Sequence, residues 1–173
     1  MINWKIINDS INAATQSHFS FTQATPLAGG NSNQAWRLGG YTELQAQRSK
    51  TDYFVKLNSA DRGAMFAAES AGLAAMAATH CVRVPRSIAH GLTEQHSFLV
   101  LEYFNLASHG NSAHLGTQLA AMHKIHAGQF GWIRDNTIGV TPQLNNRSAD
   151  WIDFWREQRL GYQLDRKRPA APP

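Results

Sequence analysis

Cysteine is nearly absent from this sequence, since Cys81 is the only one among its 173 residues. A chain with one cysteine cannot form an internal disulfide, which agrees with a reducing compartment. Long apolar segments are also missing: the run AGLAAMAA at residues 71–78 is far short of the ~20 residues that a membrane-spanning helix needs. The first ten residues lack the apolar core and cleavage site of a secretory signal. The sequence therefore predicts a soluble, cytoplasmic protein with no membrane partner.

Strong charge of either sign is missing too, because the formal net charge is only +4. The last basic residues, Arg166, Lys167 and Arg168, form a short run before the ending PAAPP. No helix-turn-helix, zinc or RNA-platform pattern accompanies this run, so we expect no nucleic-acid partner. A nucleic-acid binder would instead show steeply salt-dependent affinity that is lost when this tail is removed. We predict that residues 165–173 are a disordered, solvated tail.

Periodicity predicts mostly strands up to residue 104. Apolar residues recur at helical spacing in residues 4–14, and the alanine-rich run at residues 62–78 has high helix propensity. Strand patterns occupy residues 20–26, 34–38, 53–57 and 97–104, and Pro85 marks an edge or a break in residues 82–88. Gly39-Gly40 is predicted to open a polar connection that runs through Lys50. The last strand, SFLVLEYF, is apolar enough to be buried on both faces.

After residue 104 the pattern becomes helical. One helix carries four residues on one face, Leu115, Leu119, Met122 and His126. A second helix is predicted to start near Asp150 with Ser148 as its cap, and it carries Trp151, Phe154 and Trp155. His123 and His126 lie at a spacing that could hold a metal on a helix, but no third ligand is near, so no metal site is predicted.

The stretch LAGGNSNQAWRL at residues 27–38 sets two glycines and two asparagines between strand patterns. A glycine loop lets backbone N–H groups approach a phosphate closely, because no Cβ obstructs them. The simpler alternative is a hairpin turn that only joins two strands.

Two charged residues follow this loop in an order that favours nucleotide binding. Lys56 lies inside an apolar strand pattern, and Glu69 lies on the next helix. A lysine that reaches nucleotide phosphates needs a carboxylate to orient its ammonium group. Taken singly, Lys56 could face water on an edge strand and Glu69 could lie on a solvated helix face. The order of glycine loop, strand lysine, helix acid and apolar strand is typical of protein-kinase-like folds.

These motifs make the chain resemble the N-terminal portion of the fructosamine kinase family, also called ketosamine kinases. The resemblance rests on GGNSNQAWRL at residues 29–38, FVKLN at 54–58, AESAGLAAM around Glu69, VPRSIAHG at 84–91 and FLVLEYF at 98–104. It is most specific in residues 115–164, where FGW, DN, IG, TPQ-N and DW-FW-E-RL follow the order of the family's own signature. The match covers residues 2–164.

The resemblance implies an α+β, protein-kinase-like fold. Residues 1–104 would form an N-lobe, an antiparallel sheet with one main helix and a hinge at its end. Residues 105–164 would form the first helices of a truncated, helical C-lobe. The implied activity is ATP-dependent phosphorylation of a sugar hydroxyl on ketosamines, either small molecules or glycated proteins. Another small hydroxyl acceptor, such as an aminoglycoside or choline, stays open because the fold does not fix the acceptor.

The resemblance also implies an ATP site. The loop over the phosphates would consist of Gly29, Gly30, Asn31, Ser32 and Asn33. Lys56 would contact the phosphates and pair with Glu69, and Glu102 and Phe104, around Tyr103, would bind adenine through hinge backbone groups. Some relatives have a redox-responsive cysteine in the loop, and this chain has none there.

One departure from the family is large. Phosphoryl transfer needs an aspartate that accepts the hydroxyl proton, and further groups that hold Mg²⁺. The family's HGD-x-x-x-x-N and D-P segments are absent: His90-Gly91 precedes Leu92, and no aspartate precedes a proline. We therefore predict no catalytic residue and no Mg²⁺ ligand in this chain, as a frameshift or early stop would leave it. A non-catalytic nucleotide- or partner-binding remnant is the alternative.

Two further predictions concern residues after 104. Asp135 and Asn136, in WIRDNTIG, are interpreted as a turn with Asx hydrogen bonds and a possible substrate contact. Loss of part of the C-lobe core would expose Trp151, Trp155 and Leu160, and such an apolar patch invites self-association.

Overall fold

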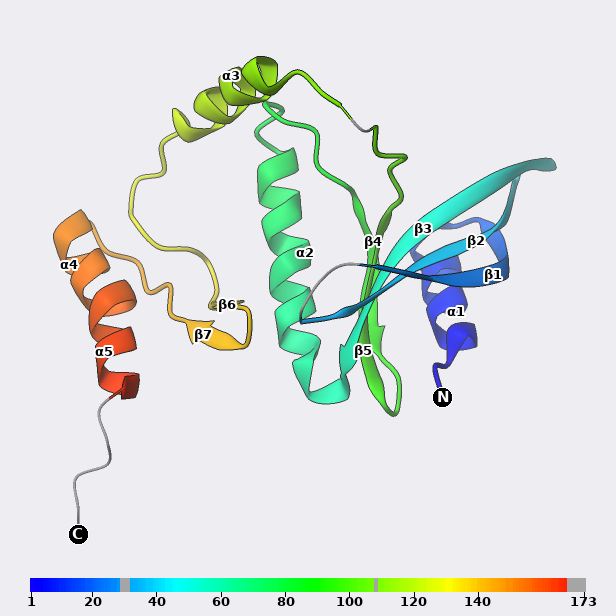
Figure 1. Ribbon diagram of the computed structural model, residues 1–173, viewed down its shortest axis with the longest axis horizontal. Coiled ribbons are helices and arrows are strands. Elements are labelled where there is room, and N and C mark those ends of the chain that lie inside the picture. Colours follow the sequence, from blue (N-terminus) through cyan, green and yellow to red (C-terminus); the bar gives the residue numbers. More distant parts are fainter. Residues whose placement is uncertain (29–31, 108, 168–173) are drawn as a thin grey trace, which may run out of the picture. The chain divides into compact units, whose positions relative to one another are not determined.

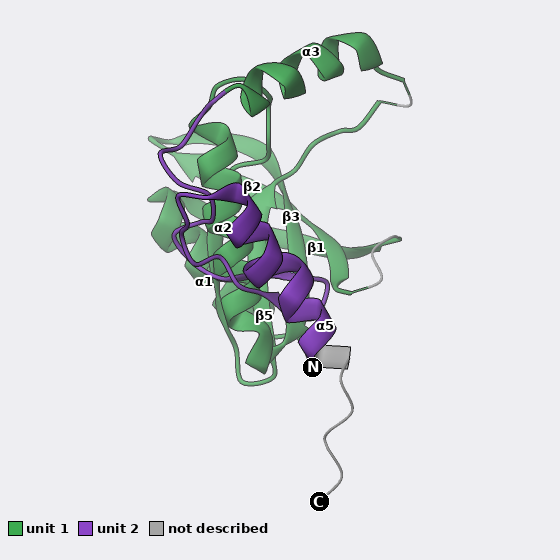
Figure 2. Cartoon of the chain, turned by 90° about the vertical axis from the view of Figure 1, so that its left-hand side faces the viewer, with its two compact units in different colours: residues 1–124 green, residues 125–173 purple. Residues whose placement is uncertain are grey.

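The computed structural model describes residues 1–28, 32–107 and 109–167. The chain divides into two compact units, Met1–Lys124 and Ile125–Pro173, coloured green and purple in Figure 2. The division falls later than the lobe boundary predicted after residue 104, since the helix α3 (Ser112–His123) is grouped with the first unit. The lobe boundary itself stays a prediction.

An antiparallel five-stranded sheet in the order β1-β2-β3-β5-β4 is the centre of the first unit (Figure 1). The strands are β1 (His18–Leu27), β2 (Gln34–Leu44), β3 (Gln47–Ser59), β4 (Ser87–Leu92) and β5 (His96–Glu102). The helices α1 (Trp4–Thr15) and α2 (Gly63–Ala77) pack against the sheet, and a short 3₁₀ turn, η1 (Ala60–Arg62), leads into α2. The α+β class and the antiparallel N-lobe sheet are thereby confirmed.

The strand β5 is buried on both faces, as its apolar sequence predicts. Phe98 and Val100 belong to the core cluster that contains the buried residues of α1, whereas Leu99 and Leu101 pack with Phe66 of α2. Successive side chains of a strand point to opposite faces. One short apolar strand therefore serves two cores, and the two helices cover opposite faces of the sheet.

The predicted polar connection from Gly39-Gly40 to Lys50 is wrong, because β2 continues through both glycines and pairs with β3 beyond them. A Cβ at Gly40 would overlap the backbone oxygen of Ser20 and lie 2.8 Å from the Cα of Phe21. The glycine is required by the close approach of β1, whose pairing with β2 shifts register at this point.

The turn between β2 and β3 consists of Gln45 and Ala46, with φ angles of 50° and 64°. Positive φ at both positions of a two-residue hairpin turn defines type I′, which asparagine and glycine favour. Neither residue type stands here, so the sequence contains no signal for the turn.

The helix α3 is capped by Asn111, whose side chain accepts a hydrogen bond from the backbone N–H of His114 at 2.9 Å. It ends at His123, before His126. The predicted helical face that includes His126 is therefore wrong, and so is the spacing of His123 and His126 on one helix. Leu115 and Leu119 of this face are exposed.

The second unit contains a small hairpin and a helical segment. The hairpin pairs β6 (Asn136–Ile138) with β7 (Thr141–Gln143), and the helical segment consists of α4 (Trp151–Trp155), the π-helical η2 (Arg156–Gly161) and α5 (Tyr162–Lys167). The hairpin was not predicted, because its strands are only three residues each and include Pro142.

Two boundaries of the helical segment differ from the prediction. The cap of α4 is Asp150, whose carboxylate accepts from the backbone N–H of Asp153 at 2.9 Å. The hydroxyl of Ser148 bonds only the backbone of Asp150, so Ser148 as the cap is wrong. The helix then continues past Leu164 to Lys167, into the predicted tail, whose residues 168–173 lie outside the described part.

Substitution Gly40→Ala should lower the free energy of unfolding by about 2 kcal/mol, because overpacking a close approach typically has this effect. Gly116→Ala is the matched control: a Cβ there meets no atom within 4 Å, and alanine favours the interior of α3. Urea unfolding of both variants measures the difference. A Gly40→Ala protein as stable as the wild type would contradict the close approach of β1 and β2.

Candidate nucleotide-binding site

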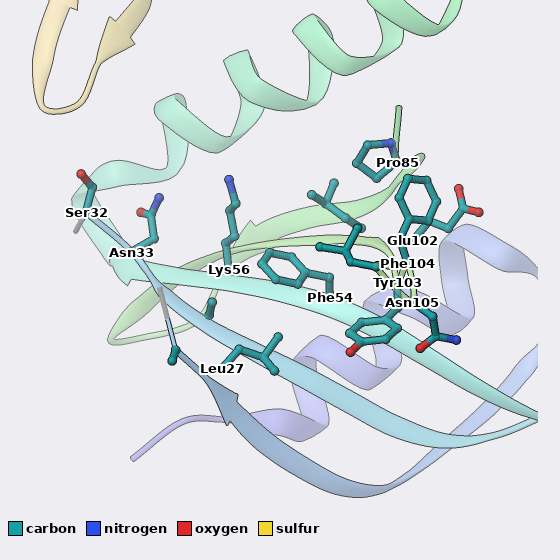
Figure 3. A pocket seen from close by; sticks show the side chains of 14 residues that line it. Leu27, Ser32, Asn33, Phe54, Lys56, Pro85, Glu102, Tyr103, Phe104 and Asn105 are labelled. Carbon is teal, nitrogen blue, oxygen red and sulfur yellow. The ribbon is translucent and has the colours of Figure 1, made fainter. Parts of the chain in front are cut away.

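A cavity of about 870 Å³, here called the main cavity, opens in the first unit. This volume is within the range of small-molecule and cofactor sites. Figure 3 shows Ser32 and Asn33 at one end, residues 102–105 at the other, and Phe54 and Lys56 between them. Phe54 also packs against the α2 cluster, so the cavity lies on the face of the sheet that carries α2.

Lys56 enters the main cavity because of the alternation along β3. Its neighbours Val55 and Leu57 are fully buried in the core cluster that contains α1, so Lys56 points to the other face. The Nζ of Lys56 lies 2.6 Å from the Oε1 of Glu69, with 27% and 30% of the two side chains exposed. The predicted pairing is therefore present.

The simpler interpretations of these two residues are wrong. The strand β3 lies between β2 and β5, so Lys56 is not on a sheet edge. Glu69 turns toward the sheet and binds the ammonium group of Lys56 rather than lying on a solvated helix face. The carboxylate thus orients a cation that lines a cavity, as the chemistry of a phosphate-binding lysine requires.

Of the predicted glycine loop, residues 29–33, only Ser32 and Asn33 belong to the described part of the chain. Ser32 and Asn33 line the main cavity next to Lys56, as predicted. Gly29, Gly30 and Asn31 lie outside the described residues.

The predicted hinge lines the opposite end of the main cavity through Glu102, Tyr103 and Phe104. The backbone N–H of Glu102 donates to the carbonyl of Arg86 at 2.9 Å, which ties the end of β5 to the segment before β4. The carboxylate of Glu102 accepts from the guanidinium of Arg83 at 2.9 Å. Among the described residues, none accepts a hydrogen bond from the backbone N–H of Phe104.

Two arginines that the sequence interpretation missed hold the aromatic rings of the hinge. The guanidinium of Arg83 lies 4.3 Å from the ring centroid of Phe104, and that of Arg37 lies 5.0 Å from the ring centroid of Tyr103. Arg37 also donates to the carboxylate of Asp52 at 2.6 Å, and this hydrogen bond raises the pKa of Arg37 above its ordinary value. The alternation of side chains along β2 and β3 places Arg37 and Asp52 on the face of the sheet that carries the cavity, and this alternation could have been recognised in the sequence.

The apolar lining was also missed. Leu27, Ala28, Ala35, Phe54 and Leu101 line the main cavity between its two polar ends. An apolar slot that ends at the backbone N–H of Phe104, which is unpaired among the described residues, suits a flat heteroaromatic ring, whereas the end at Lys56 suits an anion.

Asp135 and Asn136 lie in the second unit, where they bond a buried residue. Asp135 Oδ1 accepts from the backbone N–H of Asn145 at 2.8 Å, and Asn136 Oδ1 accepts from its side-chain amide at 3.0 Å. Arg159 donates to the Oδ1 of Asn145 at 2.6 Å, and Asn145 is only 4% exposed. The predicted turn with Asx hydrogen bonds is wrong, because Asn136 begins the strand β6 and both side chains bond Asn145 instead of the backbone two residues on. The substrate contact stays a prediction. The role of Asn145 as the central residue was not predicted, because its partners are distant in sequence.

Metal-binding clusters and membrane-spanning helices are both absent from the described residues. In that part of the chain, no three histidine, cysteine or acidic side chains come together as a metal site would need. No described helix combines the length and apolar character that a membrane crossing requires.

A five-stranded antiparallel sheet whose central strand carries a lysine paired with a helix glutamate, in a cavity also lined by Ser32, Asn33 and the end of β5, is the arrangement of a protein-kinase-like N-lobe. Within that class, the sequence model of the fructosamine kinase family matches residues 3–171. The chain therefore belongs to the fructosamine kinase family. The match extends beyond residue 164, where the predicted resemblance ends.

Individual relatives agree with this family. The chain is 43% identical over 171 residues to a probable ketoamine kinase of Synechocystis, covering 97% of this chain and 55% of that protein. It is 45% identical over 136 residues to the chloroplastic protein-ribulosamine 3-kinase of Arabidopsis thaliana, covering 73% of this chain and 41% of that protein. The chain thus spans about half the length of the curated relatives it matches.

Solved structures share the fold. A candidate fructosamine-3-kinase of Haemophilus somnus superposes with a TM-score of 0.79 at 27% identity, over 94% of this chain and 53% of that chain. A second candidate, from Thermobifida fusca, has a TM-score of 0.68 at 24% identity, over 92% of this chain and 54% of that chain, and shows the same fold. The predicted family and the predicted fold are confirmed.

Substitution Asn145→Ala should loosen the loop around Asp135 and Asn136, because it removes the three hydrogen bonds of a buried side-chain amide, to Arg134, Asn136 and Arg159. Asn146→Ala is the control, since Asn146 is exposed and makes one long bond to Gln158. Hydrogen exchange of residues 134–145 should accelerate at least about tenfold in Asn145→Ala. Equal exchange in the two variants would contradict the structural role.

Proposed function

We propose that the main cavity is an ATP site and that the first unit is the nucleotide-binding lobe of a ketosamine kinase. The observation that carries the proposal is the Lys56–Glu69 ion pair inside a cavity whose other end is a hinge. Adenine would lie in the apolar slot with its edge at the backbone of Glu102 and Phe104. The phosphates would lie at Lys56 and at the loop of residues 29–33.

The residues of this chain would bind and position the nucleotide. Lys56 supplies a fixed positive charge to the phosphates, and Glu69 holds its ammonium group so that little reorganisation is needed on binding. The apolar residues of the slot exclude water from the adenine rings, which strengthens the polar contacts at both ends. The Arg37–Tyr103 and Arg83–Phe104 contacts keep the hinge in place.

The described lining does not fit a Mg²⁺ site. Mg²⁺ requires oxygen ligands such as carboxylates. Glu102 is the only acidic residue in the described lining, and its carboxylate already binds Arg83 and the backbone N–H of Arg86. The described lining therefore supplies no ligand for Mg²⁺.

The acceptor is proposed from the relatives. The names of the Synechocystis and Arabidopsis proteins describe a ketoamine kinase and a protein-ribulosamine 3-kinase. The corresponding activity here would transfer the terminal phosphate of ATP to a sugar hydroxyl of a ketosamine, on a small amine or a glycated protein. Asp135 and Asn136 remain the proposed acceptor contacts, and an aminoglycoside-like hydroxyl acceptor remains the second choice.

Lys56→Met should weaken ADP binding at least about tenfold, because it removes a charge-assisted bond to phosphate and leaves Glu69 unpaired. Lys50→Met is the matched control, since Lys50 lies on the same strand and lines a different cavity. Isothermal titration calorimetry with ADP measures both variants. Unchanged ADP affinity in Lys56→Met would refute the phosphate assignment.

A second candidate function is nucleotide binding without turnover, favoured by the absence of the HGD-x-x-x-x-N and D-P segments from the sequence. The 173-residue chain incubated with ATP, Mg²⁺ and fructosyl-lysine should release no ADP above background, because this sequence lacks the HGD-x-x-x-x-N segment whose aspartate would accept the hydroxyl proton. A coupled ADP assay, with the chain omitted as the control, tests this. Steady ADP release that requires fructosyl-lysine would contradict it.

A further inference from the structure

Asn58 connects the end of β3 to the glycine loop. It follows Lys56 by two positions, so both side chains point to the same face of the sheet. The Nδ2 of Asn58 donates to the backbone oxygen of Ser32 at 3.0 Å and to the Oδ1 of Asn33 at 2.7 Å. Ser32 and Asn33 are the two described loop residues that line the main cavity.

The orientation of the Asn58 amide is fixed by two backbone groups. The carbonyl of Ser32 can only accept, so the group that faces it must be the NH₂. The backbone N–H of Ser59 can only donate, and it lies 2.8 Å from the Oδ1 of Asn58. Both ends of the amide are therefore occupied, and no flipped arrangement satisfies both partners.

The strand end that carries Asn58 is itself anchored in the sheet. Ser97 of β5 pairs with Asn58 in the β3–β5 ladder and is fully buried. Its hydroxyl donates to the backbone oxygen of Ser59 at 2.8 Å. A continuous series of hydrogen bonds thus runs from a buried serine in β5, through Ser59 and Asn58, to the loop at Ser32.

We infer that Asn58 is a positioning residue for phosphate binding, which holds the Ser32–Asn33 end of the loop beside Lys56. This inference rests on the proposed ATP site. Asn58 contacts the loop rather than the hinge, so its effect should fall on the phosphates of a nucleotide and not on the base. A residue that merely stabilised the fold would affect both parts of the ligand equally.

Substitution Asn58→Asp tests the inference with little change in shape. The Asp keeps the oxygen that accepts from Ser59, but it turns an acceptor toward the carbonyl of Ser32, which repels it. We expect ADP affinity to fall about tenfold, whereas the affinity for adenosine, which lacks phosphates, changes less than about twofold. Calorimetric titrations with the two ligands measure this ratio. Equal losses for ADP and adenosine would overturn the inference.

A matched control is Asn111→Asp, because the side chain of Asn111 only accepts a hydrogen bond, from His114, and aspartate can do the same. This variant should bind ADP and adenosine as the wild type does. Loss of ADP affinity in the control equal to that in Asn58→Asp would also overturn the inference.

A second measurement separates this inference from the proposed function. Amide hydrogen exchange of residues 32–35 in the ligand-free protein should be at least about tenfold faster in Asn58→Asp than in the wild type. If the wild type binds no nucleotide but this acceleration is seen, the ATP site fails and the anchoring of the loop stands. Unchanged exchange at residues 32–35 would refute the anchoring whatever the nucleotide result.

Discussion

The ion pair between Lys56 and Glu69 is the contact on which the candidate site depends. It joins the middle of the sheet to α2 at 2.6 Å, in a position where both side chains are mostly shielded from water. Shielding strengthens the attraction and also raises the penalty for losing either partner. The packing of Phe66 against Leu99 and Leu101 brings α2 to this distance. The packing of the hydrophobic core therefore sets the geometry of the cavity at Lys56.

The two ends of the main cavity are built in different ways. The end at Lys56 combines a cation held by Glu69 with loop backbone that accepts a hydrogen bond from the side-chain amide of Asn58, at Ser32. At the opposite end, the guanidinium groups of Arg37 and Arg83 contact the rings of Tyr103 and Phe104, and neither arginine lines the cavity. Arg37 and Arg83 are themselves paired with Asp52 and Glu102, and the backbone N–H of Phe104 has no acceptor among the described residues.

The residues that could be predicted from the sequence are those whose signal is local. The aromatic and β-branched run around Lys56 and the apolar run of β5 predicted the two strands and the burial of β5 correctly. The pairing of Lys56 with Glu69 was predicted from the order of the motifs and the family resemblance. Gly40 misled the interpretation, because a glycine required by a neighbouring strand looks the same in sequence as a glycine in a loop. The type I′ turn at Gln45 gave no signal at all, since its residues are unusual for that geometry.

Contacts between distant residues were beyond sequence reasoning. Arg37 of β2 and Tyr103, which follows β5, meet only because these two strands lie on either side of β3 in the sheet. Asn145 becomes central because segments on both sides of the small hairpin return to it. In both cases tertiary packing, not local preference, selects the partner.

The alternation along β3 has a consequence for how this family can vary. Deleting one residue between Gln47 and Lys56 would turn Lys56 toward the core and Val55 toward the cavity, because each side chain would move to the opposite face. Binding and folding would be lost in a single step. Insertions or deletions within β3 keep Lys56 on its face only when they involve an even number of residues. A residue added in the turn at Gln45 and Ala46 changes neither the strand pairing nor the face of Lys56. Length variation should therefore accumulate in this turn.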